Sequence, residues 1–133
     1  MRLTRMVQRD TFSGLKPRLR IGGAYRALDP RVEREILRVA QEALTNVLHH
    51  AASAEVSVEM HYSSDMLMLR IEDKGVGFDL NEASSKSAHF GLLGMKERAA
   101  GIAGEIEISS EPGQGTTVSL RVPIGQSASP ARG

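Results

Sequence analysis

Apolar and polar residues alternate in two neighbouring segments near the middle of the chain. The apolar positions are Val56, Val58 and Met60 in the first segment and Leu67, Leu69 and Ile71 in the second. A period of two residues predicts β-strands that place one face on a core and the other in water. The short segment 62–65 between them, Tyr-Ser-Ser-Asp, predicts a hairpin turn.

Two other segments are predicted to be helices. In residues 31–51 apolar side chains recur every three or four residues, which predicts a helix with one buried stripe. Asp29 and Pro30 precede it, a capping side chain followed by a proline that the first turn tolerates. A second helix is predicted over residues 92–103. The stripe of the first helix consists of Ile36, Val39, Ala40, Ala43, Val47 and Ala51.

Three further strands and one long irregular segment complete the pattern. Strands are expected at residues 15–21, where Pro17 favours an edge position, at residues 106–108 and at residues 118–122. Residues 73–89 are rich in Gly, Ser, Asn and Lys without any period, and an irregular segment of this length is typical of a functional lid. The order of the elements predicts an α+β fold, a two-layer α/β sandwich with helices on one face of a sheet.

The same pattern predicts how the chain is divided. We expect a single domain over residues 15–124. Residues 1–14 are interpreted as a linker or the remnant of an upstream segment, and residues 125–133, which are small and polar, as a disordered tail.

Composition excludes several classes of protein. With 133 residues, of which 41% are hydrophobic and 25% charged, the chain is long enough for one globular domain. A net charge of +1 and an aromatic content of 4% give no support for a nucleic-acid partner. No apolar run approaches the roughly 20 residues that cross a bilayer, so no membrane contact is expected. The absence of cysteine excludes disulfides and thiolate metal sites.

Polar side chains form a second stripe on the first predicted helix. Glu42, Asn46 and His49 are four and three residues apart, which places them within an arc of roughly 60° on an α-helix. A carboxylate and a carboxamide supply the oxygen ligands that Mg²⁺ takes, so this stripe can face a metal ion and phosphates. A solvated helix face explains the same spacing, and the spacing alone leaves both interpretations open.

Asp73 is the last residue of the second strand of the hairpin. It lies two residues after an apolar position of that strand, so it points to the same side as the apolar residues. Its carboxylate is therefore predicted to point into the layer between sheet and helices, where it needs a donor. Gly75 and Gly77 follow at once and would let the backbone approach a flat ligand whose exocyclic amine donates to the carboxylate. Thr116 has the parity of the last strand's apolar residues, so its hydroxyl is also expected inside, although threonine is common in strands without a special role.

A third glycine group, Gly91 to Gly94, is predicted to begin the second helix. Free amides and the helix dipole attract phosphate at such an end. A hinge that only turns the chain would use the same residues. Together, the carboxylate, the carboxamide, the paired glycines and the helix N-terminus are predicted to surround one crevice.

Four segments resemble, in the same order, the motifs of the GHKL ATPases. QEALTNVLHHA (41–51) resembles the asparagine box, DKGVGF (73–78) the first glycine box, GLLGMKER (91–98) the second, and PGQGTTV (112–118) the closing glycine–threonine motif. The combination is most similar to sensor histidine kinases of the branch typified by nitrate and desaturase-regulating sensors. The resemblance covers residues 30–123 and implies a Bergerat ATP-binding fold with a mixed, mostly antiparallel sheet.

The resemblance implies a site for ATP and Mg²⁺. Asn46 would hold the metal ion, and Glu42 would be the catalytic residue, as a general base or as a group that orients metal or water. Asp73 would bind the adenine amine, and residues 91–95 would cover the phosphates as part of a mobile lid. Further residues of the implied nucleotide site are His49, His50, Gly75, Gly77, Phe78, Gly91, Leu92, Gly94, Met95 and Thr116, of which Gly77 and Thr116 would support the adenine, partly through water.

The implied activity is that of a histidine protein kinase. This domain would bind Mg-ATP and donate the γ-phosphate to a histidine on a separate dimerisation segment of the same or another chain, and so act indirectly on a response regulator in a two-component phosphorelay. Such a domain is expected to be cytoplasmic, also as the cytoplasmic part of a membrane-bound sensor.

Three features depart from the pattern of the family. His49 stands where Lys or Arg is usual near the phosphates, so phosphate binding would be weaker or pH-dependent. Lys74 stands where an acidic or amide residue is common. The histidines, His49, His50, His61 and His89, all lie within the ATP-binding part, so the sequence shows no phosphoacceptor, and the chain is expected to be an excised domain or to depend on a partner.

Two other functions remain open from the sequence. An anti-sigma-factor-type serine kinase shares the fold and needs no histidine helix. A non-catalytic nucleotide-binding module would explain the histidine in place of a basic residue at position 49. A zinc site at His49 and His50 is not expected, because adjacent residues of a helix point about 100° apart.

Overall fold

The computed structural model describes residues 2–9, 14–15, 17–51, 55–76 and 86–124, with the side chains of residues 50–51 and 86–90 excepted. Its elements are α1 (Arg2–Val7), β1 (Pro17–Gly23), α2 (Pro30–Asn46), the π-helical turn η2 (Val47–Ala51), β2 (Val56–Tyr62), β3 (Met66–Asp73), α3 (Lys86–Gly101), β4 (Glu105–Glu111) and β5 (Gly115–Pro123).

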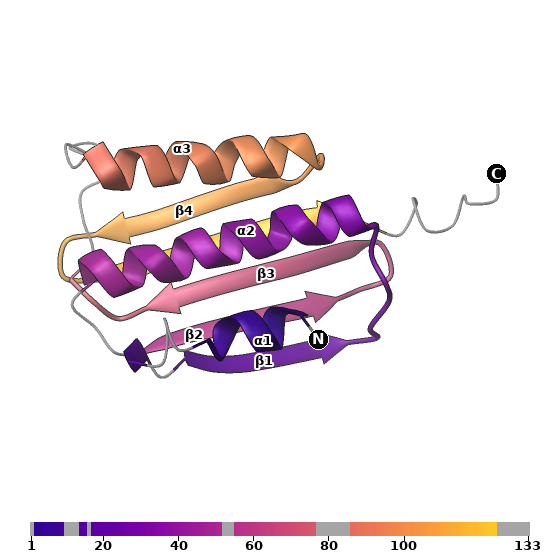
Figure 1. Cartoon of the computed structure of the whole chain (residues 1–133), viewed down its shortest axis with the longest axis horizontal. Coiled ribbons are helices and arrows are strands. Elements are labelled where there is room, and N and C mark those ends of the chain that lie inside the picture. Colours follow the sequence, from indigo (N-terminus) through magenta and orange to yellow (C-terminus); the bar gives the residue numbers. More distant parts are fainter. Residues whose placement is uncertain (1, 10–13, 16, 52–54, 77–85, 125–133) are drawn as a thin grey trace.

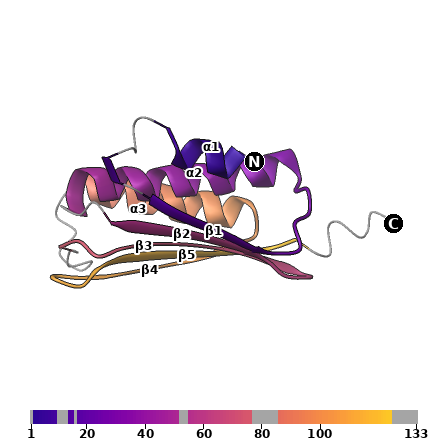
Figure 2. The same ribbon diagram turned by 90° about the horizontal axis from the view of Figure 1, so that it is seen from below.

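The strands form one sheet in the order β1-β2-β3-β5-β4. The β1–β2 pair is parallel and the other three pairs are antiparallel. The helices cover one face of this sheet, and its other face is bare of helices (Figures 1 and 2). The predicted two-layer sandwich with a mixed, mostly antiparallel sheet is therefore confirmed, as is the edge position of the strand that contains Pro17.

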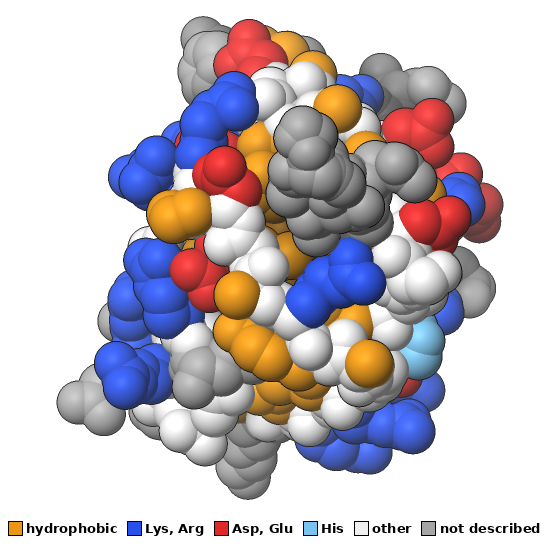
Figure 3. Space-filling view, turned by 90° about the vertical axis from the view of Figure 1, so that its right-hand side faces the viewer, with side chains coloured by type: hydrophobic (Ala, Val, Ile, Leu, Met, Phe, Trp, Pro, Cys, Tyr) orange, Lys and Arg blue, Asp and Glu red, His pale blue; other side chains and the backbone are white. Residues whose placement is uncertain are grey.

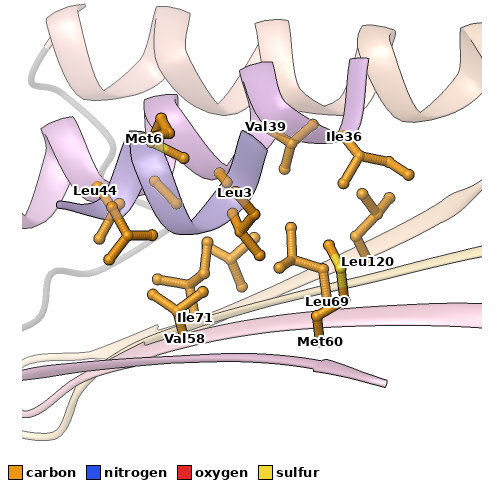
Figure 4. Close-up of a cluster of buried hydrophobic side chains, with 14 of the residues drawn as sticks. Leu3, Met6, Ile36, Val39, Leu44, Val58, Met60, Leu69, Ile71 and Leu120 are labelled. Carbon is orange, nitrogen blue, oxygen red and sulfur yellow. The ribbon is translucent and has the colours of Figure 1, made fainter. Parts of the chain in front are cut away.

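The hydrophobic core fills the space between the helix layer and the inner face of the sheet (Figure 4). The alternation in β2 and β3 places Val58, Leu69 and Ile71 inside, each at 2% exposure or less. The predicted stripe of α2 meets them from the other side. Its buried residues are Ile36, Val39, Ala40 and Ala43, joined by Val47 of η2 and by Leu44, which the stripe did not include.

Helix α1 lies within residues 1–14, the segment interpreted from the sequence as a linker or the remnant of an upstream segment. Leu3, Met6 and Val7 are buried at 1–3% exposure and belong to the same core (Figure 4). Arg2 Nη1 also pairs with Glu33 Oε1 of α2 at 3.1 Å. A helix of six residues is too short to show a helical period in the sequence, and it depends on packing for its stability. The division of the chain at residues 15 and 124 stays a prediction, and residues 125–133 lie outside the described residues.

The starts of α2 and α3 differ in how well the sequence predicts them. Asp29 Oδ1 accepts a hydrogen bond of 2.8 Å from Arg31 N, and Pro30 is the first residue of α2, as predicted. Helix α3 begins at Lys86 and not at Leu92, so the last part of the predicted irregular segment is helical. Residues 77–85, the remainder of the predicted lid, lie outside the described residues.

The two ends of the molecule differ in character. At the left end in Figure 1, the C-terminal ends of α2 and β3 come together with the N-terminal end of α3 and the β4–β5 turn. Figure 3 looks onto the opposite end, where hydrophobic side chains gather between Lys and Arg side chains. At that end Tyr25 is 65% exposed, and its ring meets the ring of Tyr62 edge-on at 5.4 Å. Among the predicted site residues that the structure describes, those that belong to or directly follow the element ends meeting at the left end are Glu42, Asn46, Asp73, Gly75 and Thr116.

Candidate functional site

Three polar side chains form one row across β3, β5 and β4 at the left end of the sheet. The register pairs Asp73 with Thr116, and Thr116 with Ser110. Among the residues that the structure describes, Asp73 and Ser110 are the buried polar ones, at 4% and 8% exposure. As the parity of β3 predicts, the carboxylate of Asp73 lies on the same inner face as the apolar side chains. These three polar side chains thus lie at one end of the inner face of the sheet, which is otherwise hydrophobic.

The environment of Asp73 supplies hydrogen bonds but little water. Its Oδ1 accepts a hydrogen bond of 2.7 Å from the backbone amide of Gly75. Burial raises the pKa of Asp73 above its ordinary value of 3.8, and the nearby charge of Glu72 acts in the same direction. Hydrogen bonds from the backbone of Gly75 and Thr116 oppose that rise because they favour the carboxylate. A further donor, such as an amine, would stabilise the charged form in the same way.

Ser110 belongs to this row although sequence reasoning did not single it out. Its Oγ lies 2.8 Å from Thr116 Oγ1 and donates to the carbonyl oxygen of Gly115 at 3.2 Å. A signal was present in the sequence, because Ser110 has the same parity as Ile106 and Ile108 and is therefore predicted to face inward with them. The signal becomes informative only when the register places Ser110 beside Thr116.

The β4–β5 turn is fixed against the segment that follows β3. Gly113 N donates to Val76 O at 2.6 Å, which ties the two glycine-containing motifs together. Gly115 has a φ of +79°, and a β-carbon there would collide with the carbonyl oxygen of Asp73. Glycine at position 115 is therefore required both by its backbone conformation and by the close approach of β3.

The polar stripe of α2 faces helix α3. A β-carbon built on Gly91 would lie 2.8 Å from Glu42 Oε2 and 3.5 Å from both side-chain polar atoms of Asn46. The asparagine and second glycine motifs are thus in contact. The carboxylate of Glu42 and the carboxamide of Asn46 converge on one point of the α2–α3 interface, so the stripe is not only a solvated helix face.

The structure corrects the position predicted for residues 91–94. They lie inside α3 and not at its N-terminus, so their amides belong to the helix and are not the free amides of a helix start. Of the two glycines, Gly91 meets the polar stripe of α2, whereas a β-carbon on Gly94 would meet nothing within 4 Å. Leu92 packs against the core, and Gly94 lines a surface groove together with Arg31 of α2. The side chain of Met95 is buried in the core at 1% exposure, which argues against the predicted phosphate-covering role for it.

The end of α2 corrects the geometry expected for His49. After Asn46 the helix widens into the π-helical turn η2, in which each residue advances by a smaller angle than in an α-helix. The arc calculated for Glu42, Asn46 and His49 therefore does not hold for His49, whose side chain is exposed. The side chain of His50 is not among those described, and Gly77 and Phe78 lie outside the described residues. His61 is exposed.

The donors at the α2–α3 interface are of the type that Mg²⁺ takes. Glu42 and Asn46 supply oxygens, and no group of three or more His, Cys, Asp or Glu side chains that could hold a metal ion occurs in the described part of the chain. Such an arrangement suits an ion that takes one or two protein oxygens and completes its coordination with phosphates and water. It does not suit a site built from protein ligands alone.

Comparison with known proteins identifies the family. The model of the histidine kinase-, DNA gyrase B-, and HSP90-like ATPase family matches residues 31–126. The chain belongs to this family. The matched residues include the polar stripe of α2 and the row formed by Asp73, Thr116 and Ser110. The relatives that resemble the chain in sequence are histidine kinases.

Two relatives carry that likeness. The signal transduction histidine-protein kinase/phosphatase DegS of Bacillus subtilis is 44% identical over 98 residues, which cover 73% of this chain and 26% of DegS. The sensor histidine kinase LiaS of the same organism is 38% identical over 98 residues, or 74% of this chain and 27% of LiaS. The chain therefore spans about a quarter of the length of these relatives. The narrower nitrate- and desaturase-sensor branch stays a prediction.

A solved structure shows the same fold at lower sequence identity. The blue-light activated histidine kinase EL346 of Erythrobacter litoralis aligns with a TM-score of 0.70 and 20% identity, over 95% of this chain and 42% of that one. The family ATPase fold is thus supported by sequence and by structure. Within the described residues no helix is long and apolar enough to span a membrane.

Proposed function

We propose that this chain is the ATP-binding catalytic domain of a two-component sensor histidine kinase. It binds Mg-ATP at the end of the sheet where Asp73 and Thr116 lie, and it presents the γ-phosphate to a histidine on a separate dimerisation segment. The observation that carries the proposal is the buried carboxylate of Asp73, on the inner face of the sheet and in one row with two hydroxyls. A carboxylate in such a position needs a donor, and the adenine amine is one.

The other residues of the site have separate proposed roles in binding the metal ion, the phosphates and the adenine. Glu42 and Asn46 converge near Gly91 and would bind Mg²⁺, which supplies positive charge against the phosphates. Gly75 holds the Asp73 carboxylate in place through its amide. His49 and His50, in η2, would lie toward the phosphates, and Gly77 and Phe78 would belong to the adenine side. Catalysis in such a site is positioning and charge neutralisation, since phosphoryl transfer asks for little covalent chemistry from the protein.

The partners follow from the reaction class. The phosphoacceptor would be a histidine of a dimerisation segment in the same or another chain, and a response regulator would take the phosphoryl group from it. One relative, LiaS, is named a sensor histidine kinase. A cytoplasmic position is proposed for this domain, also as the cytoplasmic part of a membrane-bound sensor.

Titration of the chain with Mg-ATP tests the nucleotide site. Asp73→Asn is expected to weaken ATP binding by at least about tenfold, because a hydrogen bond to a charged acceptor is worth roughly 1.5–3 kcal/mol. Asp65→Asn in the exposed β2–β3 turn is the matched control and should bind as the wild type does. Equal affinity of the Asp73→Asn variant and the wild type, with the fold retained, would overturn the proposal.

The class of acceptor is decided by the stability of the product. With ATP labelled on the γ-phosphate and a dimerisation segment supplied, the expected product is a phosphohistidine, which acid hydrolyses and alkali does not. A label on serine, stable in acid, would instead support a serine kinase of the anti-sigma-factor type. ATP binding without transfer to any supplied segment would support a nucleotide-binding module.

A further inference from the structure

Ser110 is the one buried polar residue of the described chain to which the proposed function gives no role. It lies on β4, one strand farther from Asp73 than Thr116, and is 8% exposed. Ser109 and Glu111, its neighbours along the strand, are exposed. A serine hydroxyl in such a place costs desolvation unless it is hydrogen-bonded, and its bonds to the motif that closes the site explain why it is tolerated.

The contacts of Ser110 favour one direction for the hydroxyl of Thr116. Ser110 Oγ donates to the carbonyl oxygen of Gly115 at 3.2 Å, and a serine hydroxyl has one hydrogen to give. The contact of 2.8 Å between Ser110 Oγ and Thr116 Oγ1 allows either hydroxyl as the donor. Both contacts of Ser110 can be hydrogen bonds at the same time only if Thr116 is the donor of this one. With its hydrogen directed at β4, Thr116 presents only lone pairs toward Asp73.

We propose that Ser110 is a positioning residue that holds the Thr116 hydroxyl as a hydrogen-bond acceptor, so that Asp73 and Thr116 together select a purine with an amine at the six-position. This inference rests on the proposed nucleotide site and deepens it. Two acceptors side by side fit the two hydrogens of an exocyclic amine, taken directly or through one ordered water. A carbonyl oxygen at the same position brings a third acceptor and no hydrogen.

The test compares ATP with inosine triphosphate, which has a carbonyl in place of the amine. In Ser110→Ala the Thr116 hydroxyl loses its fixed acceptor and can turn to donate. ATP should then bind roughly two- to tenfold more weakly, the range of one neutral hydrogen bond, while inosine triphosphate binds as well as before or better. The ratio of the two Kd values should therefore fall by about that factor. Ser110→Thr keeps the hydroxyl and should keep the ratio.

Two controls separate positioning from structure. Ser109→Ala removes a neighbouring hydroxyl on the outer face of β4 and should leave both Kd values unchanged. In a Thr116→Val background the hydroxyl that Ser110 orients is gone, so adding Ser110→Ala should weaken ATP binding no further. Additive effects of Ser110→Ala and Thr116→Val would overturn the role, and so would an equal loss for both nucleotides.

Failure of this inference is distinguishable from failure of the nucleotide site. If the wild type binds neither nucleotide, or if Asp73→Asn leaves ATP affinity unchanged, the proposed function is wrong. If Asp73→Asn abolishes binding but Ser110→Ala behaves like Ser109→Ala, the site stands and only the role of Ser110 is wrong.

Discussion

Gly91 of α3 faces Glu42 of α2 so closely that a β-carbon on Gly91 would lie 2.8 Å from Glu42 Oε2. Glycine in a helix interior is unfavourable by roughly 0.8–1.0 kcal/mol relative to alanine. A glycine at this position is explained if the two proposed metal-binding side chains need the space. Gly94, one turn later in the same helix, has open space where its β-carbon would be and so offers a matched comparison.

We expect Gly94→Ala and Gly91→Ala to differ in what they change. Gly94→Ala should stabilise the chain by about 0.5–1 kcal/mol through helix propensity and leave nucleotide binding unaltered. Gly91→Ala should gain less stability, because the Glu42 carboxylate has to move, and should weaken Mg-ATP binding severalfold. Urea unfolding and ATP titration of both variants measure the difference. Identical behaviour of the two variants would show that the contact with Glu42 does not matter.

The turn between β4 and β5 gives a second pair of glycines that look alike in sequence. Gly113 and Gly115 both have positive φ, of +82° and +79°, but only Gly115 approaches another strand, at the Asp73 carbonyl. Gly113→Ala is expected to cost about 1 kcal/mol of stability for its backbone conformation alone. Gly115→Ala should cost at least about 3 kcal/mol, since backbone atoms of β3 have to shift as well. Denaturant unfolding orders the two variants, and a smaller loss for Gly115→Ala would contradict the contact.

Sequence patterns predict the sheet and the direction of the Asp73 side chain well, because a side chain in a strand points to one of only two faces of the sheet. Once Leu67, Leu69 and Ile71 are assigned to the core, the inner position of Asp73 follows, and the same reasoning holds for Thr116. The capped start of α2 is equally local, because Asp29 and Pro30 act within one turn.

The parts that the sequence did not predict depend on contacts between distant segments. Helix α1 is too short to show a period, and it is held by the core it joins. The start of α3 was not predicted because residues 86–91, Lys-Ser-Ala-His-Phe-Gly, show no helical period in the sequence. The π-helical turn moves His49 away from its α-helical position, and the Ser110–Thr116 contact depends on the register of β4 with β5.

Helix α1 should be as necessary for stability as its burial indicates. Leu3→Ala is expected to lower the free energy of unfolding by about 2–4 kcal/mol, since Leu3 is 1% exposed and its removal leaves a cavity. Arg5→Ala, on the exposed side of the same helix, should change it by less than about 0.5 kcal/mol. Denaturant unfolding of the two variants tests whether the domain includes these residues. Equal stability of both variants would support the interpretation of residues 1–14 as a linker.

The buried carboxylate of Asp73 should make stability depend on pH in a predictable direction. Its pKa in the folded state is raised above the ordinary 3.8, chiefly by burial, so the folded chain holds this proton at pH values where the unfolded chain has released it. The contribution of Asp73 to stability is therefore fully present below its unfolded pKa and is lost as pH rises through the folded pKa.

Asp73→Asn isolates this contribution, because all other carboxylates titrate in both proteins. At neutral pH the variant is expected to be at least as stable as the wild type, although it loses ATP binding. As the pH falls toward the unfolded pKa of Asp73, the wild type should gain stability relative to the variant. Urea unfolding of both proteins at a series of pH values measures the difference. A wild type that is more stable than the variant at neutral pH and loses that advantage in acid would reverse the sign, and would mean that hydrogen bonds to the carboxylate outweigh its burial.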